Sequence, residues 1–448
     1  MRSLLQSPSR RSGTCATWGR SLTCQLLLAV SLVAANAAEV TFHRDVEPLL
    51  QKHCQECHRP GEIAPFSLLT YKDARPWAKA IREDVLTQKM PPWFADPKYG
   101  HFSNDRSLTK QEIDTLVAWV DNGAKEGKLA DAPKPKEWLE GWNISKPDLV
   151  LEMHSFHLPA KGDVPYQYVV LPTKFTEDKW IQMAEARPSD RTVVHHMVIF
   201  VREPESKWLR QAEPNVPFVP PGGNLNNLGG GGSEILAAYT PGKNPELWPP
   251  KQGRLIKAGS DLVLQIHYTA SGKETDDHSQ VGLVFCKEKP AERVITLAAS
   301  NIMFQIPPGD PNYPVEGKVA LPNGATILGF YPHMHLRGKA IEYRAVYPDG
   351  RTATLLRVPK YDFFWQLDYK LTEPLTVPAG TRIEVTGWFD NSPNNPRNPD
   401  ASATVRFGEQ SWEEMMVGAY DIVVPADTSL RDFFRPKTRS TAASTSSN

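Results

Sequence analysis

From about residue 147 onward, the sequence is a succession of short apolar runs, many of them alternating with polar residues, separated by proline, glycine, asparagine and aspartate. Representative runs are DLVLEM, YQYVVL, VIFV, LVLQIHY, TATLLRV and RIEVTGW. A period of two places one row of side chains on each face of a strand, and frequent turns join such strands into antiparallel sandwiches. Because one sandwich needs only about 100 residues, we expect two antiparallel β-sandwich (jelly-roll) domains, over residues 148–290 and 291–433.

Residues 39–128 carry helical signals instead. The stretch TKQEIDTLVAWVDNG opens with a capping box formed by Thr109 and Glu112, and Gly123 ends it. Apolar residues between 46 and 54 also follow helical spacing. These patterns predict a small all-α domain over residues 39–128. The proline- and lysine-rich stretch DAPKPKEW predicts a linker over residues 129–147.

The N-terminus has the pattern of an export signal. Basic residues precede the apolar run CQLLLAVSLVAANA, which ends in an A-x-A cleavage sequence at Ala37. We therefore expect a signal peptide over residues 1–37 and a mature protein that is periplasmic or otherwise exported, and soluble. The pair Arg10 and Arg11 leaves both twin-arginine and general secretion open.

The rest of the composition limits the partners. The formal net charge is +0, which gives no argument for nucleic-acid binding. No later stretch is apolar enough to cross a bilayer, so no membrane span is expected in the mature chain. The serine- and threonine-rich tail over residues 434–448 is expected to be disordered.

The stretch KHCQECHRP contains a C-x-x-C-H motif made by Cys54, Cys57 and His58. This spacing is the attachment signature of a c-type haem, in which two thiols bind the porphyrin and the histidine ligates iron. Met90, in QKMPPWF, is the candidate second iron ligand. With its flanking helices, the segment resembles a small class I cytochrome c domain with one covalently bound haem c. The alternatives are a thioredoxin-like C-x-x-C or half of a zinc site, and a packing role for Met90.

Histidines recur in the predicted strands, and two methionines follow an acidic pair near the C-terminus. Residues two apart on a strand face the same side, so His333 and His335 are expected to project together. His195 and His196 are adjacent, and could share an ion only at a bulge or strand end. Imidazole and thioether groups are suitable copper ligands. The remaining candidates are His267, Met415 and Met416.

Four motifs in order, H-H-M, Q-x-H-Y, H-x-H-L-x-G-K and E-E-M, resemble those of the copper type II, ascorbate-dependent monooxygenases. This is the family of peptidylglycine α-hydroxylating monooxygenase and dopamine β-hydroxylase, and the resemblance covers roughly residues 148–430. It implies two copper ions. One would lie on His195, His196 and His267, and the other, at the catalytic site, on His333, His335 and Met415.

Two positions depart from the peptide-hydroxylating branch of this family. Tyr331 stands where that branch carries an arginine, and Ala419 stands where it carries a tyrosine. A peptidylglycine substrate is therefore not implied.

The resulting hypothesis is an exported haem- and copper-dependent monooxygenase that hydroxylates a C–H bond of a small organic substrate with dioxygen. An ascorbate-like molecule or a redox protein would be the external electron donor, and the haem is a candidate for passing electrons to copper. A docking or sensing role for the haem segment is the alternative. The runner-up for the whole protein is a copper-binding or electron-transfer protein without oxygenase activity.

Overall fold

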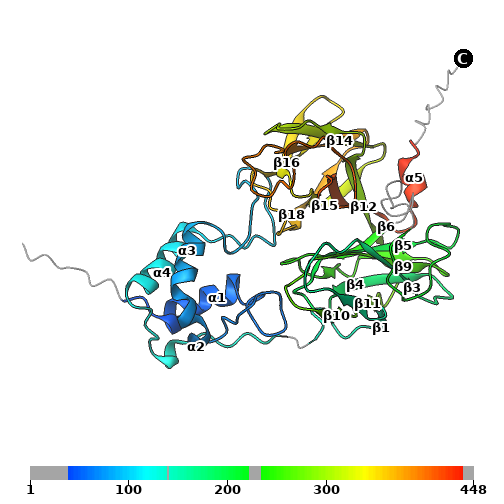
Figure 1. Cartoon of the computed structure of the whole chain (residues 1–448). Helices are drawn as coiled ribbons and strands as arrows, with labels where there is room; N and C mark the ends of the chain where they lie inside the picture. Colours follow the sequence, from blue (N-terminus) through cyan, green and yellow to red (C-terminus); the bar gives the residue numbers. More distant parts are fainter. Residues whose placement is uncertain (1–38, 139–140, 221–233, 437–448) are drawn as a thin grey trace, which may run out of the picture. The chain divides into compact units, whose positions relative to one another are not determined.

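A computed structural model of the chain describes residues 39–138, 141–220 and 234–436 (Figure 1). The described residues from Val40 onward belong to one compact unit. The predicted signal peptide and residues 437–448 of the predicted tail lie outside the described residues. The tail was expected to begin at residue 434, but Phe434 is the last residue of helix α5 (Leu430–Phe434). In the described ranges, no helix combines the length and the apolar character that crossing a membrane requires.

Strands dominate this structure, and the predicted all-α cytochrome c-like domain is wrong. Strands account for 37% of the described residues and helices for 13%. The helices are short, and the loop between them joins the β region. In that loop Phe102 forms a β-bridge with Leu371, and the rings of Trp93 and Phe102 pack on Tyr369. The segment therefore shares its packing with the sheets and is not a self-contained helical domain.

In this N-terminal segment, the predicted capping box can be compared directly with the structure. At the start of α4 (Lys110–Asp121), Thr109 accepts a hydrogen bond from the Glu112 backbone N–H, and the Glu112 carboxylate accepts one from the Thr109 N–H. Gly123 follows the helix with a φ of 87°. The predicted capping box and helix end are confirmed. The elements are η1 (Phe42–Val46), α1 (Glu47–His53), α2 (Tyr71–Ala74), η2 (Arg75–Trp77), α3 (Ala78–Leu86), α4 (Lys110–Asp121) and η3 (Leu129–Asp131).

The first β body comprises strands β1 to β11. Sheet β3-β9-β5-β6 and the strands β1-β11-β4-β8 enclose one apolar core, to which Leu171, Ile199 and Leu264 contribute from one sheet and Ile181 and Leu283 from the other. The strands are β1 (Leu149–Glu152), β2 (Phe156–Leu158), β3 (Gln167–Pro172), β4 (Lys179–Arg187), β5 (Val194–Arg202), β6 (Glu234–Tyr239), β7 (Glu246–Leu247), β8 (Gln252–Ile256), β9 (Asp261–Tyr268), β10 (Thr275–Asp277) and β11 (Gln280–Phe285).

The second β body comprises strands β12 to β21. Sheet β14-β19-β16-β17 and the strands β12-β21-β15-β18 enclose a second core. Alternation along the strands accounts for this core. In β19, for example, the residues alternate strictly between buried and half-buried, so one face of the strand points into the core. The elements are β12 (Glu292–Asn301), β13 (Gln305–Ile306), β14 (Tyr313–Leu321), β15 (Ala325–His333), β16 (Gly338–Val346), β17 (Thr352–Val358), β18 (Tyr369–Val377), β19 (Thr381–Phe389), β20 (Val405–Arg406), β21 (Met416–Pro425) and α5 (Leu430–Phe434).

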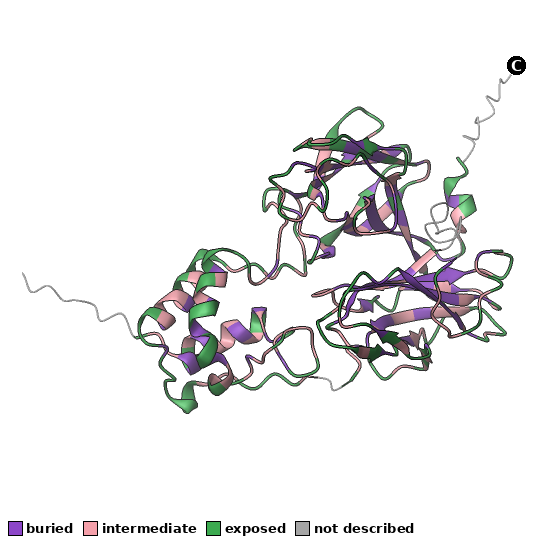
Figure 2. Ribbon diagram, viewed as in Figure 1, coloured by how far each residue is buried: buried purple, intermediate pink, exposed green. Residues whose placement is uncertain are grey.

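One sheet runs through both β bodies. Strands β8 and β12 pair in parallel over two residues, which makes a nine-stranded sheet in the order β1-β11-β4-β8-β12-β21-β15-β18, with β7 paired to β4. A buried ion pair between Arg254 and Asp421, 2.7 Å apart, ties the bodies together beside this junction. Buried residues are concentrated along the strands (Figure 2). The domain boundaries expected from sequence stay predictions.

Candidate metal centre and adjoining cavities

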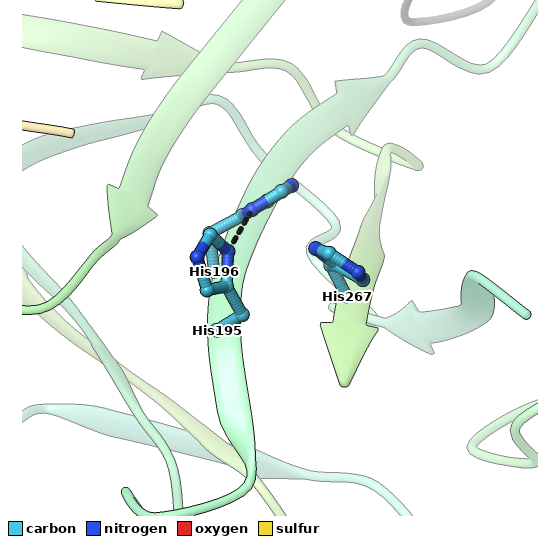
Figure 3. A group of neighbouring side chains, drawn as sticks. All are labelled: His195, His196 and His267. Carbon is cyan, nitrogen blue, oxygen red and sulfur yellow. Dashed lines mark hydrogen bonds between the residues drawn. The ribbon is translucent and has the colours of Figure 1, made fainter. Parts of the chain in front are cut away.

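A β-bulge brings three histidines together in the first β body. His196 on β5 lies opposite His267 on β9, and the register shifts between Val194 and His196, which leaves His195 outside the regular pairing. Such a bulge lets adjacent side chains turn toward the same place. One ring nitrogen from each histidine lies within 4.8 Å of the others (Figure 3). The bulge that His195 and His196 need in order to share one ion is therefore present.

The two histidines of the H-x-H motif adjoin this group. The rings of His333 and His335 lie 5.2 Å apart between centroids, and His333 lies 5.5 Å from His196. Strand β15, which ends at His333, belongs to the second β body. All five rings therefore form one histidine cluster, defined as His195, His196, His267, His333 and His335, and the two predicted copper sites adjoin each other.

Hydrogen bonds orient the rings of the H-x-H motif. Nδ1 of His333 lies 2.7 Å from the side-chain oxygen of Gln366, and Nδ1 of His335 lies 3.4 Å from the carbonyl oxygen of Glu413. Both oxygens are acceptors, so each Nδ1 carries the proton and each Nε2 is left to bind an ion. This arrangement is usual around metal-binding histidines.

Three buried ring nitrogens of the cluster have no hydrogen-bond partner among the described residues. They are Nε2 of His195, Nδ1 of His267 and Nε2 of His335. A buried polar atom without a partner costs about 1–3 kcal/mol, which a bound metal would offset. The residues present therefore fit a metal ion, and the imidazole donors fit copper.

Burial keeps the cluster neutral. Burial first, and the neighbouring imidazoles second, lower the pKa of His195 to about 4 and that of His267 to about 3. The pKa values of His196, His333 and His335 are also lowered, again chiefly by burial. A neutral imidazole is the form that binds metal, so the cluster is ready for an ion at neutral pH.

These lowered pKa values predict how the metal-free protein responds to acid. Unfolded histidines have a pKa of about 6.5, so below that pH the unfolded chain binds protons that the folded cluster does not. The free energy of unfolding should therefore decrease as the pH falls from about 6.5 toward 4. We expect the melting temperature of the metal-free protein, followed by circular dichroism, to fall over this range.

A double variant distinguishes the contribution of the histidine cluster to this pH dependence from that of other titrating groups. His195→Asn with His267→Asn removes two of the buried bases, so its melting temperature should depend less steeply on pH. An unchanged slope would assign the effect to other residues.

Copper bound to the wild type should leave in the same acid range while a covalently attached haem stays. Loss of both together would instead indicate global unfolding.

The two adjacent methionines have different surroundings. Met415 is 4% exposed and lines a cavity that it shares with His196 and His333. Met416 is fully buried in the core of the second β body, against Gly317 and Gly387. Met415, and not Met416, therefore lines the cavity beside the histidine cluster.

Glu414 explains the acidic pair that precedes Met415. Its buried carboxylate accepts hydrogen bonds from the backbone N–H groups of His335, at 2.9 Å, and Arg337, at 2.6 Å. Tyr361 accepts a hydrogen bond from the Met334 N–H in the same turn. These contacts hold the H-x-H backbone beside the methionine. The E-E-M motif pointed to this region, although not to this role.

Two aromatic residues that sequence reasoning missed pack on the cluster. Tyr166 stacks on His267 with ring centroids 4.6 Å apart, and its hydroxyl lies 3.3 Å from Nε2 of His196. Phe363 stacks on His195 at 4.4 Å. They restrict the orientation of the imidazoles and exclude water. Neither they nor Gln366 lies in a recognisable motif, so no sequence signal marked them.

The four predicted haem-binding residues line one cavity of about 390 Å³ in the helical segment. Nδ1 of His58 lies 3.2 Å from the carbonyl oxygen of Phe66, which leaves Nε2 as its free donor atom. Both cysteines are free thiols. An apolar cavity that combines two thiols, an imidazole and a thioether fits a covalently attached haem. The four are Cys54, Cys57, His58 and Met90.

The surroundings of the thiols do not favour the alternative uses of this motif. Burial raises the pKa of Cys54 to about 12 and also raises that of Cys57. A redox-active C-x-x-C requires a lowered thiol pKa. Within the described ranges, the group His195, His196 and His267 is the one set of three or more histidine, cysteine or acidic residues placed to hold a metal. No partner for half of a zinc site is therefore seen there.

No protein-family model and no curated protein matches this chain. Among solved structures, the infectious bursal disease virus VP2 subviral particle is 10% identical with a TM-score of 0.18, over 66% of this chain and 76% of that chain. PNGF-II is 11% identical with a TM-score of 0.24, over 63% of this chain and 62% of that chain. Likenesses this weak carry no argument about fold or function.

Proposed function

We propose that this protein is a copper-dependent monooxygenase that uses dioxygen to hydroxylate a C–H bond of a small organic molecule. The observation that carries the proposal is the buried histidine cluster. Three of its ring nitrogens have no partner among the described residues, and two of its members, His196 and His333, line a cavity together with Met415. The order of the H-H-M, Q-x-H-Y, H-x-H-L-x-G-K and E-E-M motifs, which resembles that of the copper type II monooxygenases, supports the same reading.

The ligand assignment follows the two halves of the cluster. His195, His196 and His267 would hold one copper, and His333, His335 and Met415 the other. Copper at these positions would supply one-electron chemistry and activation of dioxygen, and thioether ligation favours its reduced form. The chain itself orients the ligands, through the acceptors of His333 and His335 and the rings stacked on His195 and His267.

The helical segment would hold a haem through the thiols of Cys54 and Cys57, and His58 and Met90 would supply the iron ligands. Haem bound there would supply one-electron chemistry. A run of three consecutive aromatic residues reaches from the haem cavity to the histidine cluster. Phe364 and Trp365 line the haem cavity, and Phe363 stacks on His195. This continuity supports the haem as an electron source for the copper ligands, with an ascorbate-like molecule or a redox protein as the external donor.

The N-terminal sequence supports export to the periplasm, where c-type haem is attached. The proposed enzyme would therefore work outside the cytoplasm. The runner-up, a copper-binding or electron-transfer protein, would need the histidines and the haem cavity but not a cavity beside Met415.

The test combines stoichiometry with oxygen uptake. Protein purified with its haem and loaded with copper should contain two copper ions and one haem per chain. With ascorbate as reductant, oxygen consumption should rise on addition of a substrate, and label from ¹⁸O₂ should appear in the product. Full metal content without substrate-dependent oxygen consumption across a broad panel would replace the oxygenase proposal with the runner-up.

A further inference from the structure

A cavity of about 260 Å³ adjoins the histidine cluster. The alternation of side chains along the strands explains which residues form one of its walls. One face of β15 presents Tyr331 and His333, and one face of β21 presents Val417, Ala419 and Asp421. These residues all line the cavity, and so does Ala298 on β12, which is the pairing partner of Ala419. The second β body thus forms one wall, with His333 at the metal end.

The first β body forms the opposite wall, which is largely hydrocarbon. Val198 and Phe200 on β5, with Ile235 and Leu236 on β6, line it. Together with Val417, Ala419 and Ala298 they offer a ligand mostly aliphatic and aromatic surface. Apolar walls with few polar groups are typical of pockets for small organic molecules.

The charged residues of the cavity neutralise one another. Lys243 is paired with Glu246, and Arg254 with Asp421 at 2.7 Å. Asp421 also accepts a hydrogen bond from the Tyr331 hydroxyl at 3.0 Å. The lining charges therefore sum to zero, because two cations meet two anions. A charged ligand would lose its hydration without gaining a free counter-charge, which is unfavourable.

We propose that this cavity binds the substrate, and that the substrate is a small, uncharged, largely apolar molecule about the size of one substituted aromatic ring. The volume sets the size, because an apolar cavity of about 150 Å³ holds benzene and this one measures about 260 Å³. The carbon to be hydroxylated would lie at the end lined by His333 and Met415. The inference rests on the proposed function for its substrate role, and on the cavity alone for its ligand class.

The test uses four ligands that share a ring and differ in charge. Ethylbenzene and 2-phenylethanol are neutral, phenylacetate is an anion, and 2-phenylethylammonium is a cation. Their binding to the full-length, haem-containing protein is measured by titration calorimetry, with and without copper. The neutral pair should bind, and both ions should bind at least about tenfold more weakly, a difference of about 1.4 kcal/mol.

A pair of variants tests the location. Ala298→Phe places a ring in the cavity at an exposed strand position, so it should weaken binding of the neutral pair about tenfold or more. Ala320→Phe, at an exposed position of β14 outside the cavity, should leave binding unchanged. Circular dichroism melting confirms that both variants fold.

The outcomes separate this inference from the proposed function. Equal or tighter binding of either ion, no binding of the neutral pair, or neutral binding that Ala298→Phe does not affect would each overturn the ligand class or its site. Neutral binding in the cavity without copper-dependent oxygen uptake would support the ligand class and remove the oxygenase proposal. Copper-dependent hydroxylation of charged ligands alone would support the oxygenase proposal and overturn the ligand class.

Discussion

The Met415→Ile variant is expected to lose hydroxylation by about 100-fold or more while it keeps its fold and the copper on His195, His196 and His267. Isoleucine replaces the thioether with hydrocarbon of similar volume, so packing is retained but a soft donor for reduced copper is lost. The measurement is product formation under saturating ascorbate, together with copper content, which should fall from two ions toward one.

Met416→Ile is the matched control, because this neighbour lies in the core and not on the cavity. A swap of similar volume should cost less than about 1.5 kcal/mol of stability and leave hydroxylation intact. If Met416→Ile abolished turnover and Met415→Ile did not, the two roles would have to be exchanged. Full activity in both variants would remove methionine ligation from the proposal.

The double variant Cys54→Ser, Cys57→Ser is expected to lose covalent haem completely. Serine hydroxyls cannot form thioether bonds, and both thiols line the cavity that also contains His58 and Met90. The measurement is haem that stays with the polypeptide after denaturation, detected by its peroxidase stain and absorbance. The wild type should carry one haem, and the variant none.

Cys286→Ser is the control for this prediction. Cys286 is a free thiol that does not line the haem cavity, so its removal should leave haem content unchanged. A wild-type protein that acquires no haem when matured by a c-type attachment system would refute the haem proposal. With ascorbate supplied directly, the haem-free variant should still load copper, because the histidine cluster lies on other elements.

Local sequence signals predicted local structure well where short-range physics dominates. The capping box of Thr109 and Glu112 begins α4 as expected, because its hydrogen bonds connect residues three positions apart. The strict alternation of β19 likewise follows its sequence. The wider prediction of an all-α domain was wrong because it extended these local signals to a whole segment. The bridge between Phe102 and Leu371 depends on a strand far along the chain.

In the candidate site, too, local features could be predicted from sequence and long-range contacts could not. The spacing of His333 and His335 predicted neighbouring rings, which the structure contains 5.2 Å apart. The adjacent pair at 195 and 196 needed a bulge, and only the register of β5 against β9 shows that one is there. Gln366 and Tyr166 contact the imidazoles from loops that carry no motif, so they could not be found from sequence.

The kinds of donor atom, the strand periodicity and the cap of α4 could be predicted because they depend on residues close together in the chain. The meeting of the histidines of both β bodies in one cluster could not, because it depends on contacts between distant segments. That contact depends on the parallel pairing of β8 with β12 and on the buried pair of Arg254 and Asp421. Both join residues far apart in sequence, and the packing of two separate cores, which no short pattern encodes, sets how they meet.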